Sequence, residues 1–435
     1  MNRRYFLMGL AGTVAARRLG AATPRIDGAA LDQDLRALSM IGRPAGGTFQ
    51  SGVSRIGYSD ADIAGRKFIM DLMRRTGAAV RVDAAGNIFA ERPGRETGLP
   101  PVLFGSHIDS VPNGGNFDGD LGSLSAVHVL RLLQENRMET RRPLTAVVWA
   151  CEEATFAGRS LNGSRTAAGK TEAKDLDVVS RGLSKSESIR RIGGDPTRLE
   201  TAVLRDGAYH AYVELHIEQG GTLAREKIAI GVVDGIVSID QYDVVVTGVA
   251  NHAGTTPMPD RQDALLAAAR LTLAVREVVT GEAGAQVGTV GHLEVSPNAS
   301  NVIPGEVRMT VEFRDLSSAK LDRLGAQIQA RAASIAADSR TQIRMTRVER
   351  HDSAMAAVEV QRAIEAAAGR LRLDTRHLPS GAGHDAQMMA ARMPMGMIFV
   401  PSVGGISHSP KEFTEFQDCA NGANALLETV LTLAS

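Results

Sequence analysis

The sequence lacks several features that would assign it to a specialised class of protein. Its 435 residues include only Cys151 and Cys419, too few for a disulfide framework. Aromatic residues make up 4%, and no apolar run after residue 20 approaches the length of a membrane span. Basic and acidic residues balance at 49 each, without the basic excess of a nucleic-acid-binding protein. We therefore expect a globular protein of two or three domains that binds neither nucleic acid nor a membrane.

The first 24 residues have the pattern of an export signal. Arg3 and Arg4 precede a mildly hydrophobic stretch, and a run of small residues ends at Ala22. This order resembles a twin-arginine signal peptide with a cleavage site near Ala22. Residues 1–24 are thus predicted to be a signal and the protein to be periplasmic. The alternative is a cytoplasmic protein with a basic N-terminus.

The segment from 60 to 150 alternates helix-like and strand-like patterns. The predicted elements are a helix over 60–75, a hairpin over 79–90, a strand over 102–105, a helix over 121–133 and a strand over 144–150. Strand, helix and strand at these lengths indicate a βαβ unit in a parallel or mixed sheet. Such sheets bind ligands at the carboxyl edge of their strands.

A second pattern between 221 and 337 predicts an inserted domain. It contains an alternating strand over 239–248, a helix over 261–279, a strand over 307–314 and a helix over 320–337. Two such units can form a small four-stranded α+β sheet with two helices on one face. The catalytic domain would then consist of 25–220 and 338–435, with hinges near Gly220-Gly221 and Ala337. The second part is expected to contain a strand over 342–348, a helix over 355–371, a strand over 397–400 and a helix over 419–433.

Five side chains in five short motifs are candidate metal ligands. They are His107 in GSHIDS, Asp118 in NGGNFDGD, Glu153 in WACEEATF, His216 in ELHIEQG and His408 in GISHSP. Imidazoles on either side of a shared carboxylate give the ligand count that a pair of zinc-like ions needs. Taken singly, each residue could also be an ordinary core or surface residue.

The neighbours of these ligands suggest further roles. Glu152 and Glu153 follow an apolar strand, where two adjacent carboxylates are costly without a positive partner. One could bind metal while the other takes a proton from a water, although a solvated charge pair is the alternative. Asp109 is expected to fix the tautomer of His107. Cys151 is interpreted as a buried packing residue.

Taken together, the motifs resemble the hydantoinase/carbamoylase branch of the dinuclear metallopeptidase and aminoacylase superfamily. The similar stretches run from about Gly105 to Thr414, with EEATFAGRSLNGSR, ELHIEQG, NHAGTTPM, SGAGHDA and GISHSP most typical of the branch. The branch includes N-carbamoyl-L-amino-acid hydrolases, allantoate and ureidoglycolate amidohydrolases and β-ureidopropionases. The resemblance implies a mixed-sheet α/β catalytic domain and an inserted domain that serves as a dimerisation domain and lid.

The resemblance also implies roles for individual residues. One ion would be held by His107, Asp118 and His216, the other by Asp118, Glu153 and His408. Asp118 would bridge the ions, and Glu152 would be the general base. His252, in NHAG, would reach across a homodimer interface and stabilise the oxyanion in the partner's site.

Further residues are expected to bind the substrate. Arg314 would grip a substrate carboxylate with Asn301 beside it, although an ion pair with Asp315 is the alternative. The resemblance places Gln219, His384 and Gly405 in the same cleft. Asp385 would support the site from behind.

The expected reaction is hydrolysis of the carbamoyl C–N bond of an N-carbamoyl amino acid or a related ureido acid such as allantoate. The expected cofactors are two divalent ions per subunit, zinc first, with manganese, cobalt or nickel as alternatives. An aminoacylase or peptidase is the first alternative function. It is disfavoured because Ala154 follows the glutamate pair, where peptidases usually have glycine. An exported solute-binding protein is the second, but Glu152 and five ligands would have no purpose there.

Overall fold

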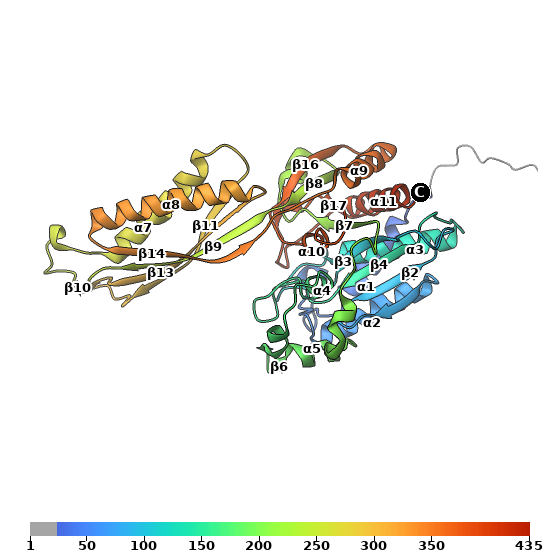
Figure 1. The fold of residues 1–435 in the computed structure, drawn as a ribbon, viewed down its shortest axis with the longest axis horizontal. Coiled ribbons are helices and arrows are strands. Elements are labelled where there is room, and N and C mark those ends of the chain that lie inside the picture. Colours follow the sequence, from blue (N-terminus) through green and yellow to red (C-terminus); the bar gives the residue numbers. More distant parts are fainter. Residues whose placement is uncertain (1–23) are drawn as a thin grey trace, which may run out of the picture.

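The structure, a computed structural model, describes residues 24–435, except for the side chains of Glu349 and His351. The expected signal peptide lies almost wholly outside these residues. The described residues form two large sheets, each with its own helices, and two small two-stranded ones, and the smaller unit projects from the larger one (Figure 1). No helix in the described part of the chain combines the length and the hydrophobicity that a bilayer crossing requires.

The larger unit is built on a nine-stranded mixed sheet. Its strands are β1 (Ala79–Val82), β2 (Ile88–Arg92), β3 (Val102–His107), β4 (Leu144–Trp149), β7 (Ala211–Ile217), β8 (Ile230–Ile236), β15 (Ala354–Met355), β16 (Thr375–Ser380) and β17 (Met395–Val400). The order is β1-β2-β4-β3-β7-β17-β8-β15, and β16 pairs with β8. The neighbours β4, β3, β7 and β17 are mutually parallel. Their carboxyl ends therefore meet at one edge of the sheet.

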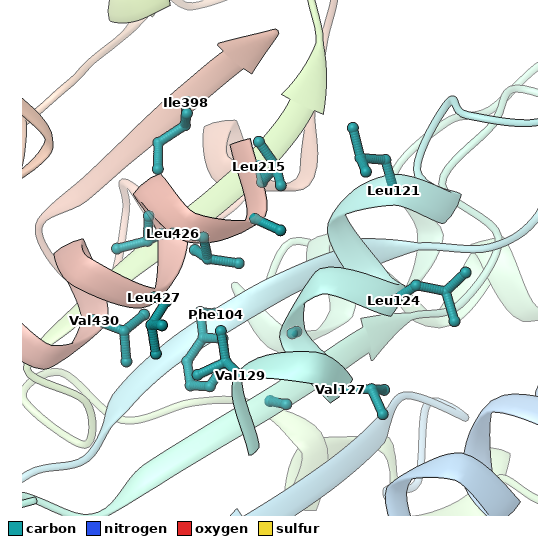
Figure 2. Packing of buried hydrophobic residues seen from close by; sticks show 14 of the residues in the cluster. Phe104, Leu121, Leu124, Val127, Val129, Leu215, Ile398, Leu426, Leu427 and Val430 are labelled. Carbon is teal, nitrogen blue, oxygen red and sulfur yellow. The ribbon is translucent and has the colours of Figure 1, made fainter. Parts of the chain in front are cut away.

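Helices cover both faces of this sheet. They are α1 (Gly28–Leu38), α2 (Asp60–Arg75), α3 (Asp120–Glu135), α4 (Asn162–Ala167), α5 (Lys185–Arg191), α6 (Thr222–Glu226), α9 (Val358–Leu371), α10 (Asp385–Met389) and α11 (Phe416–Leu433). On one face, leucines of α3 and α11 pack against Phe104 and Leu215 of the central strands (Figure 2). The central strands are buried along their whole length and are mostly apolar, and their polar residues include His107 at the end of β3 and Glu214 and His216 on β7.

The smaller unit has the four-stranded sheet and two helices that the sequence predicts. It comprises β9 (Ser238–Thr247), β11 (Val287–Ser296), β13 (Glu306–Asp315), β14 (Gln342–His351), α7 (Ala264–Gly281) and α8 (Ser318–Ser339). The order is β11-β13-β9-β14, and all pairs are antiparallel. Alternate residues of β9 and β13 are buried in a core shared with both helices. A short ribbon of β10 (Asn251–His252) and β12 (Val302–Ile303) lies at the outer end (Figure 1).

The membership of the two sheets differs from the expected boundaries. β8 lies within the predicted insertion yet pairs with β17 of the main sheet, whereas β14 lies within the predicted second catalytic part yet pairs with β9. The chain crosses between the sheets near Val237 and Asp352, not near Gly221 and Ala337. β8 and β9 are consecutive in the chain, with only Val237 between them. Their local patterns therefore do not reveal which sheet each one joins.

Candidate active site

The five candidate ligands meet at the carboxyl edge of the main sheet. His107 ends β3, His216 lies one residue before the end of β7, and Glu153 follows β4. Asp118 comes from the loop before α3, and His408 from the loop after β17. Their side chains form two groups of close ligand atoms, His107–Asp118–His216 and Asp118–Glu153–His408. Segments almost 300 residues apart in the chain thus converge on one carboxylate.

The distances around Asp118 fit a pair of divalent ions. Its Oδ1 lies 3.4 Å from Nε2 of His107 and 3.1 Å from Nε2 of His216. Its Oδ2 lies 3.5 Å from Nε2 of His408, which is 3.5 Å from Oε1 of Glu153. Ligand atoms around one tetrahedral zinc ion, with bonds of about 2.0–2.1 Å, stand about 3.3 Å apart. The two oxygens of Asp118 therefore face two separate ligand sets.

The hydrogen bonds of the buried imidazoles turn lone pairs toward Asp118. Nδ1 of His107 lies 3.0 Å from the carbonyl oxygen of Asp109, and Nδ1 of His216 lies 2.9 Å from that of Ile217. A carbonyl oxygen can only accept, so each Nδ1 carries a hydrogen. When both rings are neutral, as ion binding requires, each Nε2 directs a lone pair at Asp118, and Nε2 of His216 also accepts from the backbone nitrogen of Gly119 (3.2 Å). A cation between them relieves that repulsion.

Asp109 acts differently from the prediction. The carbonyl oxygen of this residue, not its carboxylate, accepts from His107, and the nearest carboxylate oxygen is 3.7 Å from Nδ1. The carboxylate instead accepts from the backbone nitrogens of Glu152 (2.9 Å) and Glu153 (3.2 Å). Asp109 thereby ties the end of β3 to the glutamate pair after β4.

The site concentrates negative charge away from water. Burial and the nearby Glu153 raise the pKa of the Glu152 carboxyl well above its usual range, despite the opposing His107. Burial and Asp118 raise the pKa of Glu153 to about 7. Burial would also raise the pKa of Asp118, but His216 and the other imidazoles hold it well below its ordinary value. Oε2 of Glu152 lies 3.8 Å from Nε2 of His107, at the edge of the first ligand set.

Glu412 holds the ligand loops together, a contact that sequence reasoning missed. Its Oε1 accepts from the backbone nitrogens of Phe117 (3.0 Å) and Asp118 (3.1 Å). Its Oε2 accepts from Oγ of Ser407 at 2.8 Å, and the same hydroxyl lies 3.0 Å from Oδ2 of Asp118. The sequence offered one signal for this contact, a glutamate four residues after His408. A glutamate at such a position is equally common on a protein surface, so the contact could not be inferred from it.

Glu214 is a second buried carboxylate behind the site, and sequence reasoning also missed it. It accepts from Oγ of Ser106 (2.8 Å) and from the backbone nitrogen of Ala386 (3.0 Å). These bonds join β3, β7 and α10. Its position two residues before His216 puts it on the same face of β7, a signal that the alternation of the strand contained. Asp385, expected to support the site, is fully buried beside this network, where burial and Glu214 raise its pKa.

Gln219 and His384 lie in the cleft as expected. Nε2 of Gln219 donates to Oδ2 of Asp118 at 2.6 Å. The His384 ring packs edge-on against the His216 ring, with centroids 4.5 Å apart, and its Nε2 lies 2.9 Å from Oγ of Ser380. Burial and His216 lower the pKa of His384 well below its usual value. The ring is therefore neutral and available for hydrogen bonding.

A cavity of about 270 Å³ opens beside the ligands. Its lining comprises His107, Asp118, Glu152, Glu153, Ala154, Ser160, Leu161, His216, Gln219, Ile239, Arg314, Ala382, Gly383, His384, Gln387 and His408. Arg314 enters it from β13 of the smaller unit. Its Nε donates to Glu312 (2.6 Å) and its Nη1 to the carbonyl oxygen of Gly381 (2.7 Å). The alternative pairing with Asp315 does not occur, because Asp315 binds Lys320.

Three of the residues predicted to act on or bind the substrate lie outside this cavity. Gly405 packs against the backbone of Gly221 and does not line the cleft. His252 and Asn301 are both exposed. His252 belongs to β10, which lies at the outer end of the smaller unit (Figure 1), and the carbonyl oxygen of Asn301 accepts from the backbone nitrogen of Ala253 next to it. Asn301 is therefore not beside Arg314 within one chain. Most of β13 separates them: from Glu306 to Arg314 the strand has eight residue steps (314 − 306), a length of about 27 Å.

The His252 ring is oriented although it is exposed. Its Nδ1 accepts from the backbone nitrogens of Gly254 (3.0 Å) and Thr255 (3.2 Å). Because a backbone nitrogen only donates, the hydrogen of the neutral ring is on Nε2. His252 thus presents a hydrogen-bond donor to the solvent at the end of the smaller unit.

Comparison with known proteins agrees with this arrangement. Residues 103–432 match the model of "Peptidase family M20/M25/M40". The chain is 37% identical over 410 residues to N-carbamoyl-L-amino acid amidohydrolase of Geobacillus stearothermophilus, covering 94% of this chain and 99% of the relative. It is 33% identical to allantoate amidohydrolase of Escherichia coli, covering 93% and 98%. The crystal structure of a hydantoinase/carbamoylase family amidase from Burkholderia multivorans superposes with a TM-score of 0.88 at 36% identity, covering 94% and 98%.

The family model spans the main sheet from β3 onward, the ligand loops and the smaller unit. Enzymes of this family use divalent metal ions, which agrees with the two ligand groups around Asp118. Architecture, ligand geometry and sequence similarity lead to the same assignment: the chain belongs to the M20/M25/M40 peptidase family and, within it, to the hydantoinase/carbamoylase amidases.

Proposed function

We propose that this chain is a metal-dependent amidohydrolase that cleaves the carbamoyl C–N bond of a ureido acid. The observation that carries the proposal is the shared carboxylate of Asp118 between two ligand sets, with Glu152 beside them and Arg314 in the same cavity. The relatives support the substrate class. Those cited above are named for N-carbamoyl-L-amino acids and allantoate, and a 37% identical relative from Arabidopsis thaliana is a ureidoglycolate hydrolase.

His107, Asp118 and His216 would hold one ion, and Asp118, Glu153 and His408 the other. When bound, the two ions supply the Lewis acidity that lets a water lose its proton near neutral pH. Glu152 accepts that proton and later returns it to the leaving nitrogen. Its burial suits both steps, because a raised carboxyl pKa lies closer to that of such a water. Zinc is our first expectation for histidine and carboxylate ligands, although availability also decides which metal is bound.

Arg314 binds the substrate carboxylate in this proposal. Among the residues that the structure describes, no acceptor bonds its Nη2, so the guanidinium retains a donor for a ligand. The smaller unit contributes Arg314, and the larger unit contributes the metal ligands. Substrate therefore bridges the two units.

The functional protein is proposed to be a homodimer. His252 and Asn301 lie at the far end of the smaller unit, where they cannot serve the cavity of their own chain. In a dimer they enter the partner's cavity, where Nε2 of His252 donates to the oxyanion that forms during attack. The tautomer fixed by Gly254 and Thr255 suits this role.

The proposed compartment is the periplasm, on the pattern of residues 1–24 alone. A fusion of this segment to a reporter should be exported, and replacing Arg3 and Arg4 by lysine should retain the reporter in the cytoplasm. Equal export of both fusions would contradict the twin-arginine route.

The reaction is tested by the release of ammonia from a panel of substrates. The panel contains allantoate, ureidoglycolate, 3-ureidopropionate and several N-carbamoyl-L-amino acids, with N-acetyl amino acids and dipeptides as controls. We expect turnover of a ureido compound that a chelator abolishes and that Glu152→Gln lowers at least about a hundredfold. Turnover of the controls alone, measured as free amino acid, would instead support the aminoacylase or peptidase alternative. Chelator-sensitive turnover of any kind would contradict the solute-binding alternative.

A further inference from the structure

Gln387 lies in the wall of the cavity and has no role in the proposed chemistry. It belongs to α10 and is 8% exposed. Its Nε2 donates to the carbonyl oxygen of Asp352 at 2.8 Å, at the point where the chain returns from the smaller unit. Because a carbonyl oxygen can only accept, the amide nitrogen must face Asp352 and Oε1 must face away from it. The orientation of the amide is therefore fixed by the backbone.

The free oxygen of Gln387 lies beside Gly383. A Cβ added to Gly383, another lining residue, would stand 3.4 Å from Oε1. No described residue donates to Oε1, and Oε1 is not among the fully buried atoms without a partner, so it remains accessible. Gln387 thus presents a fixed acceptor in the cavity.

The position of Oε1 relative to Arg314 indicates which part of a substrate it could contact. Nη1 of Arg314 donates to the carbonyl oxygen of Gly381, so residues 381–383 lie between Arg314 and Gln387. The scissile group belongs at the metal ligands and the carboxylate at Arg314. The part of the substrate that remains for Oε1 in the same cavity is the substituent on the carbon next to the carboxylate, and we assign it to Oε1 on this ground.

We propose that Gln387 determines specificity by accepting a hydrogen bond from an N–H or O–H group on that substituent. The inference rests on the proposed ureido hydrolysis. It favours acids with a second ureido, carboxamide or hydroxyl group over acids with an alkyl side chain. An alkyl group would cover Oε1 without giving it a donor, and an acceptor left unpaired in this way lowers kcat/KM by about tenfold or more.

The wild-type protein is tested with substrate pairs of similar shape. N-carbamoyl-L-asparagine is compared with N-carbamoyl-L-leucine, and N-carbamoyl-L-serine with N-carbamoyl-L-2-aminobutyrate; allantoate provides a second ureido group. We expect the member with the donor to have a kcat/KM at least about tenfold higher. A ratio near one or below one in both pairs would overturn the inference, and this result requires no variant to fold.

A variant and a matched control separate specificity from structure. Gln387→Met should bring the ratio in each pair close to one. Gln361→Met removes a similar bond, from an amide to the carbonyl oxygen of Val233 (3.2 Å), away from the cavity and should leave the ratio unchanged. Equal losses for both members of each pair in Gln387→Met would mean a purely structural role and overturn the inference. If the wild type hydrolyses no ureido compound at all, the proposed function itself fails, and the inference fails with it.

Discussion

At the scale of single residues, buried carboxylates outside the two ligand groups hold the candidate metal ligands in place. Glu412 joins the Asp118 loop to the Ser407 loop, and Asp109 joins β3 to the glutamate pair. Each accepts hydrogen bonds from backbone nitrogens of a neighbouring segment. These contacts fix the positions of the ligands before any ion binds.

The carboxylate of Glu412 is predicted to strengthen metal binding because it accepts a hydrogen bond from Ser407. The single hydrogen of Ser407 is shared between Glu412 (2.8 Å) and Asp118 (3.0 Å). In Glu412→Gln the new amide donates to Ser407, whose hydrogen then turns fully to Asp118 and competes with the ions. We expect metal affinity to fall about tenfold, measured as activity against free zinc in a metal buffer.

Glu415→Gln is the matched control, because Glu415 is exposed and lies only three residues further along the chain. It should leave the zinc dependence unchanged. The same affinity in both variants would show that Glu412 only contributes to folding.

At the scale of elements, the site depends on how closely α3 approaches β7. Asp118 precedes α3 and His216 belongs to β7, so the spacing of these two elements sets the distance between the ligands. Gly122 lies at the contact, where an added Cβ would be 2.1 Å from the carbonyl oxygen of Leu215. Only glycine permits this approach.

Gly122→Ala is predicted to push α3 away from the sheet. The overpacking should lower the free energy of unfolding by about 2 kcal/mol. It should also weaken metal binding, because Asp118 moves with the helix. Denaturant unfolding and metal titration measure the two effects.

Gly369→Ala in α9 provides the control, since nothing lies within 4 Å of its added Cβ. There the substitution should raise stability by about 0.5–1 kcal/mol, because alanine favours a helix. If Gly122→Ala were equally stabilising, the proposed close approach would be wrong.

At the scale of the whole molecule, one chain brings the five candidate metal ligands together, whereas β10, which contains His252, lies at the outer end of the smaller unit (Figure 1). The proposed dimer makes a direct prediction for mixed subunits. His252→Ala and Glu152→Gln should each be almost inactive alone while retaining metal. Mixed and reassembled in equal amounts, they should regain about a quarter of wild-type activity, because half of the dimers then contain one intact site.

The same experiment distinguishes action within a chain from action across the interface. If His252 served its own chain, a mixed dimer would lack either His252 or Glu152 in every site, and mixing would restore nothing. Loss of metal in His252→Ala would also contradict its proposed role, since His252 lies far from every ligand.

The sequence by itself determined what depends on local pattern. The helix over 60–75 is α2, the hairpin over 79–90 is β1 and β2, and the small sheet with two helices followed from alternation and helical spacing. The five candidate ligands could be named from the sequence because each side chain lies within its own short motif. The family assignment followed from the same motifs.

Only the tertiary structure decided what depends on pairing between distant segments. β8 joins the main sheet and β14 joins the smaller sheet because of the strands with which they form hydrogen bonds. The local sequence of a strand does not specify those partners. The contact of Glu412 with Asp118 spans 294 residues. The separation of Asn301 from Arg314 likewise follows from the direction of β13. The local spacing of residues predicts each helix or strand and the candidate metal ligand next to it. The packing of distant segments determines which of these elements and side chains come into contact.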